Sequence, residues 1–334
     1  MIEKLRLART VRHVMQKTTP LLSIRIPATS ANLGAGFDCI GVALNLWNTF
    51  ELHLVPGQEA AVTVESHGEA AATLPKDHTN TVARILFEEL DEVLGQKAPG
   101  PLKIVCRNNV PCGSGLGSSS TAVIAGLVFA QALARRELTP ENLDTLKRAV
   151  LPRAVEIEGH GDNVVPALTG GLMVITRAAN GRLLTHAIPL PRQRVVVCVP
   201  DFAFLTSKAR AVLPPALPRT DAVYNIGHAV LTIEALRTGD LKLLAKALDD
   251  RMHEPYRVPA IPGAIEARQA ALDAGAAASC LSGAGPGILA FAGGEHERVG
   301  EAMKRCFADA GLQARYWVLD TTDSGAEISL GVPV

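Results

Sequence analysis

A run of glycine and serine that passes directly into an apolar segment constrains this chain more than any other feature. Residues 109–121 read NVPCGSGLGSSST, and AVIAGLV follows. Gly113, Gly115 and Gly117 let backbone N–H groups turn inward at positions closed to residues with a Cβ atom. The hydroxyl residues then begin a helix, whose N-terminal dipole favours an anion. The pattern predicts a phosphate-binding loop, and a turn that only caps a buried helix remains the alternative.

Two familiar phosphate loops do not fit this stretch. A Walker A loop has Lys after its last glycine, where this chain has Ser118. A dinucleotide fingerprint has the spacing G-x-G-x-x-G, whereas these glycines are spaced G-x-G-x-G. The loop is therefore expected to wrap phosphates with backbone amides and hydroxyls. Neutralising the phosphate charge is left to Mg²⁺ and to residues elsewhere.

Composition limits the class of protein. The 334 residues suffice for two domains and a large core, and 48% are hydrophobic against 20% charged. Lys+Arg and Asp+Glu number 33 each, so no net field favours nucleic acid or an acidic membrane surface. The six cysteines form no C-x-x-C pair, which is typical of a reducing compartment. We expect a cytoplasmic protein with a small-molecule substrate.

The N-terminus carries no targeting or membrane signal by pattern. No apolar run reaches the roughly eighteen residues of a membrane span. Residues 1–20 hold five basic side chains but no apolar core of a secretory signal. They are interpreted as an extension or tail outside the core fold.

Polar residues gather in two further loops. Residues 28–38 (ATSANLGAGFD) lie between predicted strands and contain Asn32 and Asp38. Residues 156–166 (EIEGHGDNVVP) crowd acid, imidazole and amide groups into a glycine-punctuated turn. A ligand site and a solvated turn both remain open for the first loop, and the second favours a site. Arg210 and Arg257, taken alone, would be solvated surface charges.

Two helices bear on these loops. Apolar residues recur at helical spacing over 82–94, with Thr79 or Asn80 as the cap and Gly95 as the stop. A later helix leads to Glu158, and Pro152 is expected to kink or end it.

Three motifs in a set order resemble the signatures of the GHMP small-molecule kinases. They are residues 27–38 (PATSANLGAGFD), 111–120 (PCGSGLGSSS) and 281–286 (LSGAGP). Residues 32–38, 158–163 and 253–257 (HEPYR) make the chain most similar to the homoserine kinases of that family. The resemblance covers nearly everything from Leu22 to Asp320.

This resemblance implies a fold and an activity. The fold would be α+β, with an N-terminal ribosomal-protein-S5-domain-2-like domain over 21–187 and a C-terminal ferredoxin-like domain over 188–334. The reaction would transfer the γ-phosphoryl group of ATP, with Mg²⁺, to the side-chain hydroxyl of L-homoserine in threonine biosynthesis. The products would be O-phospho-L-homoserine and ADP. A homodimer is also implied.

The resemblance also implies roles for individual residues. Nucleotide contacts would come from Asn80, Pro111, Cys112, Gly113, Ser114, Gly115, Leu116, Gly117, Ser118, Ser119 and Ser120. Ser118 and Glu158 would reach Mg²⁺. The substrate would contact Asn32, Asp38, His160, Asn163, Thr206, Arg210, Arg257 and Gly283. Asn32, Glu158 and Asn163 would take part in catalysis.

The chemistry of these residues suits a zwitterion. An ammonium group needs a carboxylate and a carboxylate needs a forked donor, which Asp38 and the two arginines supply. Related kinases have Asp where this chain has Asn163, and an amide is no base at neutral pH. We therefore expect that no side chain fully deprotonates the hydroxyl.

Three positions depart from the family pattern. Ala35 stands where the first motif usually has Pro, and Gly287 stands where Thr is common. The first change would loosen the turn without removing a ligand, and with the second a hydroxyl contact of the relatives is either absent or supplied by another group. Pro152 lies close to Glu158 and leaves the orientation of that acid open.

Two rival functions stay open at this point. A kinase for another alcohol, such as mevalonate or a sugar, would have no ammonium to bind, so the discriminator is whether Asp38 faces the pocket opposite the two arginines. A non-catalytic, kinase-like binding protein is the other rival. The presence of Ser118, Glu158 and the glycine loop speaks against it.

Overall fold

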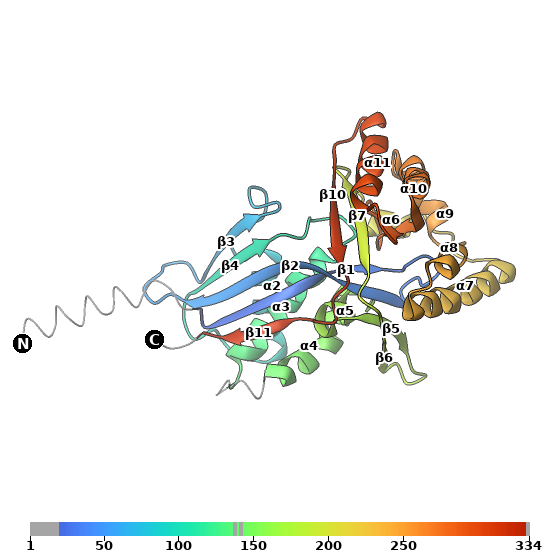
Figure 1. Cartoon of the computed structure of the whole chain (residues 1–334). Coiled ribbons are helices and arrows are strands. Elements are labelled where there is room, and N and C mark those ends of the chain that lie inside the picture. The colour runs from blue at the N-terminus through green and yellow to red at the C-terminus, as the bar shows by residue number, and fades with distance from the viewer. Residues whose placement is uncertain (1–19, 136–138, 140–142, 332–334) are drawn as a thin grey trace, which may run out of the picture.

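The computed structural model describes residues 20–135, 139 and 143–331, and in it two β-sheets are flanked by helices (Figure 1). The first sheet is built around two long antiparallel strands, β1 (Leu22–Ala31) and β2 (Ile40–Leu54). Its order is β11-β1-β2-β4-β3, with β5 paired to β2 and β6 to β5. The other strands are β3 (Val62–Gly68), β4 (Leu102–Asn108), β5 (Leu172–Arg177), β6 (Leu183–Ile188) and β11 (Glu327–Leu330).

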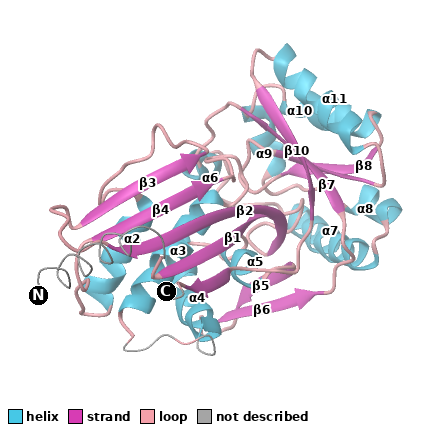
Figure 2. Ribbon diagram, turned by 60° about the vertical axis from the view of Figure 1, so that its left-hand side comes forward, coloured by secondary structure: helices cyan, strands magenta, loops and turns pink. Residues whose placement is uncertain are grey.

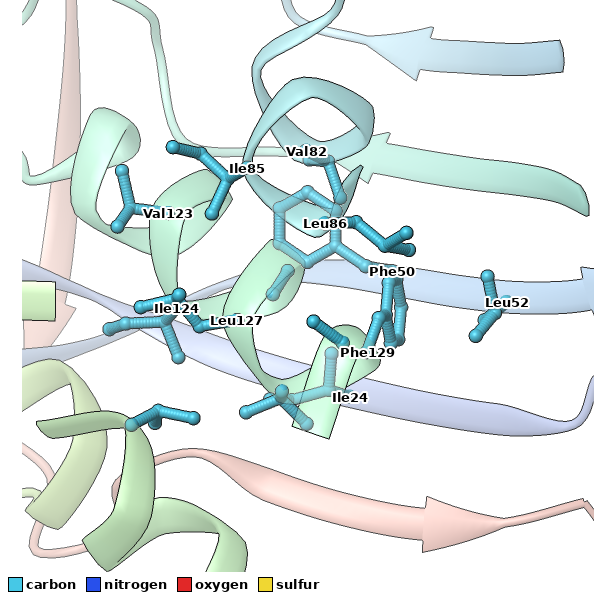
Figure 3. Packing of buried hydrophobic residues seen from close by; sticks show 14 of the residues in the cluster. Ile24, Phe50, Leu52, Val82, Ile85, Leu86, Val123, Ile124, Leu127 and Phe129 are labelled. Carbon is cyan, nitrogen blue, oxygen red and sulfur yellow. The ribbon is translucent and has the colours of Figure 1, made fainter. Parts of the chain in front are cut away.

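Helices cover one face of this sheet and bury a large apolar core. They are α2 (Thr81–Phe87), the π-helix η1 (Glu88–Val93), α3 (Ser118–Leu133), α4 (Leu143–Glu158) and α5 (Val164–Thr169). Figure 3 shows Ile24 and Phe50 of the sheet among Leu86, Ile124 and Leu127 of α2 and α3. Each such side chain adds roughly 1.5–3 kcal/mol when fully buried. The core therefore holds α3, and with it the glycine loop, firmly against the sheet.

The second sheet has the strand order β10-β7-β9-β8, and Figure 2 shows its strands β7, β8 and β10 at the upper right. Its strands are β7 (Arg194–Pro200), β8 (Ala276–Leu281), β9 (Ile288–Ala292) and β10 (Ala314–Asp320). Its helices are α6 (Thr206–Ala211), α7 (Arg219–Thr238), α8 (Leu241–Ala247), α9 (Glu254–Arg257), α10 (Ala264–Asp273) and α11 (His296–Asp309), with a 3₁₀ turn, η3 (Val258–Ala260). The order fourth, first, third, second is that of a ferredoxin-like sheet.

Side chains on the two faces of β7 pack into different apolar clusters, and one of these clusters connects the two halves of the molecule. Val196 and Cys198 pack under α10 and α11, while Val195 and Val197 face a cluster that includes residues of the first sheet. Successive residues of a strand point to opposite faces, so one strand serves both layers. The two halves thus share a continuous apolar contact.

The described elements differ from three expectations. Residues 28–31, expected in a loop between strands, are the last four residues of β1 and pair with β2. The helix α4 continues through Pro152 to Glu158. Of the two effects expected of Pro152, a kink or an end, the end is therefore wrong, and the kink stays a prediction. Val150, Ala154 and Val155 on either side are buried in the core, which stabilises the helix despite the missing N–H. The helix expected over 82–94 begins as expected, capped by Asn80, but its last turns are the π-helix η1.

The division at residues 187 and 188 stays a prediction. The strand β6 ends at Ile188, close to that point, and β11 pairs with β1 of the first sheet. The proposed extension, residues 1–20, lies outside the described residues except for Pro20. Within the described ranges, no helix is long and apolar enough to cross a membrane.

Candidate active site

Backbone hydrogen bonds hold the three sequence motifs together. The carbonyl of Leu116, in the glycine loop, accepts from the N–H of Thr29, and the carbonyl of Ala31 accepts from the N–H of Gly283, both at 3.1 Å. The first motif, on β1, therefore lies between the other two. Segments more than 80 residues apart in the chain form one surface.

The glycine loop has the conformation that its sequence predicted. Gly113, Gly115 and Gly117 all have positive φ, between 65° and 79°. A Cβ atom on Gly115 would collide with the carbonyl of Ser282, and one on Gly117 with the hydroxyl of Thr29. Glycine is needed for the backbone conformation and also for the close approach of the neighbouring motifs.

A cavity of about 460 Å³ lies at the N-terminal end of α3, which starts directly after this loop. It brings together most of the predicted site residues: Asn32, Asp38, Gly113, Ser114, Gly115, Gly117, Ser118, Ser119, Ser120, Glu158, His160, Asn163, Thr206, Arg210, Arg257 and Gly283. Asp162, Phe204 and Ala284 also line it. Because the cavity meets a helix N-terminus, it suits an anion.

A second cavity, of about 200 Å³, adjoins the first at Gly113, Ser118 and Ser119. Asn80 and Cys112 line it. The Asn80 side chain also caps α2 by accepting from the N–H of Val82 at 3.0 Å. Pro111 and Leu116 line neither cavity. The carbonyl of Pro111 accepts a hydrogen bond from the hydroxyl of Ser114 at 2.7 Å, and Leu116 is fully buried. Both residues therefore shape the loop.

Glu158 lies at the end of α4, facing the first turn of α3. Its two carboxylate oxygens accept from the hydroxyls of Ser119 at 2.8 Å and Ser120 at 3.2 Å. The hydroxyl of Ser118 donates instead to the carbonyl of Val110 at 3.4 Å. Glu158 and Ser118 thus line the same cavity without a hydrogen bond between their side chains.

These two residues fit a magnesium ion that is shared with a phosphate. Among the residues that the structure describes, no three His, Cys, Asp or Glu side chains form a group that could hold a metal. Mg²⁺ commonly takes only one or two protein carboxylates and completes its shell with water and substrate phosphates. Glu158 and Ser118 supply such an incomplete oxygen set beside the loop.

A charged cluster, Asp38 with Arg210 and Arg257, also lines the larger cavity. Both terminal nitrogens of Arg210 donate to the carboxylate of Asp38, at 2.8 and 3.1 Å. The guanidinium groups of Arg210 and Arg257 lie 5.5 and 5.1 Å from the centre of the Phe37 ring. Arg257 is only 1% exposed, and burial, together with the charge of Arg210, lowers its pKa to about 10. The cluster is suited to a carboxylate ligand.

A polar network links the turn after α4 to β1. The carboxylate of Asp162, which is buried, bonds to Nδ1 of His160 at 2.6 Å and accepts from the N–H of Asn163 at 3.0 Å. Burial disfavours the imidazolium of His160, but the hydrogen bond and charge of Asp162 outweigh it and raise the pKa of His160. The hydroxyl of Thr29 donates to Oδ1 of Asn163 at 2.7 Å.

Asn32 connects the first motif to the third. Its Nδ2 donates to the carbonyl of Gly283 at 2.7 Å, and its Oδ1 accepts from the N–H of Asp38 at 3.0 Å. Sequence reasoning assigned no role to Thr29 or Phe37. Their places inside the first motif, beside Asn32 and Asp38, were the available signal.

Two models of known protein families match this chain. The model for the "GHMP kinases N terminal domain" matches residues 78–171, and that for "GHMP kinases C terminal" matches residues 232–309. The chain belongs to the GHMP kinase family. The predicted family and its two-domain α+β fold are confirmed.

Within that family the chain is similar to homoserine kinases. The homoserine kinase of Gloeobacter violaceus is 42% identical over 93% of this chain and 100% of its own length. That of Desulfitobacterium hafniense is 38% identical over 92% of this chain and 100% of its own length. The crystal structure of homoserine kinase from Cytophaga hutchinsonii superposes with a TM-score of 0.76 at 29% identity, covering 94% of this chain and 99% of that one.

Proposed function

We propose that this protein transfers the γ-phosphoryl group of ATP to the side-chain hydroxyl of L-homoserine, giving O-phospho-L-homoserine and ADP in threonine biosynthesis. One observation carries the proposal. A single cavity is lined both by the N-terminus of α3 and by Asp38 with two guanidinium groups. The helix N-terminus suits a phosphate, and the charged cluster suits an amino acid. Relatives named homoserine kinase match nearly the whole chain.

The nucleotide would use both cavities. Its phosphates would lie against the N–H groups of the loop from Gly113 to Ser119, and its base in the smaller cavity. That cavity is lined by apolar groups of Phe50, Leu74 and Cys106, together with the polar Asn80. Loop and cavity adjoin, so one extended ligand can fill both.

Mg²⁺ would be held by Glu158 and Ser118 together with the phosphates. When bound, the ion would neutralise charge on the phosphates. The protein's own part is positional: Ser119 and Ser120 orient the Glu158 carboxylate by donating to it. In this orientation the Glu158 carboxylate lines the larger cavity.

The amino acid would replace the ion pair between Asp38 and Arg210. Its ammonium would pair with Asp38, and its carboxylate would lie between Arg210 and Arg257, with Thr206 nearby. Mevalonate has a carboxylate but no ammonium, so it would take Arg210 and leave Asp38 without a cation, whereas a neutral sugar has no charge that could replace the pair between Asp38 and Arg210. Discrimination against them follows from the cost of an unpaired charge in a partly buried site.

We further propose that no side chain fully removes the proton from the substrate hydroxyl. The Oδ1 atom of Asn163 already accepts from Thr29, and an amide is not a base. The proton would leave late or pass to phosphate. A pH–rate profile with one essential base near neutrality would contradict this, and loss of that limb in His160→Gln would assign the base to His160.

A homodimer is also proposed, formed through α7. Val223, Ile226 and Val230 are 63%, 66% and 64% exposed and lie on one side of this helix. If two copies of α7 pair antiparallel about a two-fold axis, Val223 meets Val230 of the second copy, and Arg219 meets Glu234. Such a self-complementary stripe is what an isologous interface requires.

A coupled assay of ADP release tests the reaction. ATP and Mg²⁺ would be combined with L-homoserine, L-serine, L-threonine, mevalonate or galactose. We expect a strong preference for L-homoserine. Activity only on mevalonate or galactose would keep the kinase and overturn its substrate, and no turnover with any alcohol, despite ATP binding, would favour a binding protein.

A further inference from the structure

We infer that His253 is a positioning residue that holds the guanidinium of Arg257 in place for the substrate carboxylate. The inference rests on the proposed function, because it concerns the same end of the cavity. His253 does not line that cavity and is fully buried, so it acts only through its neighbours. It immediately precedes α9, which carries Arg257.

The hydrogen bonds of His253 define its tautomer. Nε2 lies 2.9 Å from the carbonyl oxygen of Gly34, which can only accept, so Nε2 carries the proton. Nδ1 is then an acceptor, and it lies 3.5 Å from Nη1 of Arg257. A doubly protonated ring would instead direct a second donor at the arginine. The neutral ring is the form that fits both neighbours.

Arg257 is held on three sides by these contacts. Its Nε donates to the carbonyl of Ala209 at 2.9 Å, and its Nη1 faces His253. The Phe37 ring lies 5.1 Å from its guanidinium carbon and 5.3 Å from the centre of the His253 ring. Arg257 also lines the cavity, and the edge with Nη2 has no hydrogen-bond partner among the described residues. The position of that edge therefore depends on His253.

His253 also ties the two charged ends of the amino acid site together. Gly34 belongs to the turn that leads to Asp38, the proposed ammonium partner, and Arg257 is the proposed carboxylate partner. A single imidazole spans from one to the other. The spacing between the two sites, and so the fit of an α-amino acid, would be set partly by this ring.

The main chain around His253 is held independently of its side chain. The Asp250 carboxylate accepts from the N–H groups of His253 and Glu254, both at 2.7 Å. It also accepts from the side chain of Asn225 at 2.6 Å. Its Oδ2 lies 3.7 Å from Nε2 of His253, farther than the Gly34 carbonyl. Replacing the imidazole should therefore leave α9 folded.

The experiment compares two substrates that differ by one group. L-Homoserine has the carboxylate, and 3-amino-1-propanol is the same molecule without it. For His253→Ala we expect the KM for L-homoserine to rise by about tenfold or more. A loss of this size corresponds to the free energy of a hydrogen bond to a charged group. The KM for ATP and the kcat/KM for 3-amino-1-propanol should stay within about twofold of wild type.

Two further variants separate positioning from stability. His253→Gln keeps a donor for Gly34 and more of the volume, so it should recover part of the loss. Thr232→Ala removes another buried hydrogen bond, the one that the Thr232 hydroxyl donates to the carbonyl of Ala247. This bond does not involve Arg257, so the KM for L-homoserine and the KM for ATP should both stay unchanged. In His253→Ala/Arg257→Ala the KM for L-homoserine should equal that of Arg257→Ala alone.

Specific results would overturn the inference. An equal loss on both substrates, or additive effects in the double variant, would show that His253 does not act through Arg257. Wild-type protein that fails to phosphorylate L-homoserine would overturn the proposed function itself, and the inference with it.

Discussion

The Glu158 carboxylate lies where the end of α4 meets the start of α3, and its contacts suggest a test at the scale of one residue. Glu158→Gln keeps an acceptor for Ser119 and Ser120 but removes the charge. We expect turnover to fall by at least about tenfold, because a lost metal ligand weakens mainly the transition state. The free energy of unfolding, measured in urea, should change little.

Glu156→Gln provides the matched control. It is the same substitution two residues earlier on α4, at a side chain that pairs with Arg153 outside the cavity. Wild-type turnover in Glu158→Gln, or an equal loss in both variants, would remove Glu158 from the proposed metal site.

His160 predicts a pH dependence of stability with a definite sign. Its pKa is raised above the ordinary 6.5 in the folded protein, so the folded state holds its proton more tightly than the unfolded state. The stabilisation is complete below pH 6.5 and is lost as the pH rises through the raised pKa. The difference in unfolding free energy between wild type and His160→Gln should shrink over that range, by less than about 1.4 kcal/mol per pH unit. A difference that is constant or grows from pH 6 to 8 would contradict this.

Predictability from the sequence differs between the two ends of the cavity for a physical reason. The loop from Gly113 to Ser119 could be predicted because glycine spacing and hydroxyl residues act on the backbone locally. Arg257 could not, because its burial depends on Phe37 and Ala209, which are distant in the chain. Only the likeness to a family pointed to it. The pairing of Asp38 with Arg210 was equally invisible to local patterns.

Helices show the same division at the scale of the element. The Asn80 cap of α2 follows from a local rule, and the structure confirms it. The continuation of α4 through Pro152 does not follow from a local rule, since burial of Ala154 and Val155 outweighs the tendency of proline to break a helix. Gly126, inside α3, is a third case: by local preference it weakens the helix, yet a Cβ atom there would crowd the carbonyl of Val82 and the side chain of Ile85.

This crowding predicts opposite effects for one substitution in two helices. Gly126→Ala should destabilise the protein by about 1–3 kcal/mol, because overpacking between α2 and α3 exceeds the gain in helix propensity. Gly227→Ala, on the exposed side of α7 with no atom of its own chain within 4 Å of the new methyl group, should stabilise the subunit by up to about 1 kcal/mol when measured in the Ile226→Glu background, which removes the proposed dimer contact. Urea unfolding of both variants measures the two signs. A stabilised Gly126→Ala would show that α2 and α3 can move apart at no cost.

At the scale of the whole molecule, the site exists only because the two halves pack together. Asp38 and Glu158 come from the first half, and Arg210 and Arg257 from the second. The sequence patterns predict the strands of each half, but the return of β11 to the first sheet and the apolar contact through β7 depend on contacts between distant segments. Such contacts leave no local pattern. The sequence could therefore indicate which residues form the site, but not how they are arranged in space.

The stripe on α7 carries the last prediction. Ile226→Glu should convert a dimer to a monomer. Each subunit would bring one charged side chain into the middle of the apolar isologous contact, and both charges would lose their hydration there. Light scattering after size exclusion measures the mass. Val93→Glu is the control, since Val93 is also exposed, at 53%, but lies in the first half of the molecule. The stripe shares no residue with the cavity, so ADP release per subunit should be kept in the monomer. A wild-type protein that is already monomeric, or an Ile226→Glu variant that stays dimeric, would exclude α7 as the interface.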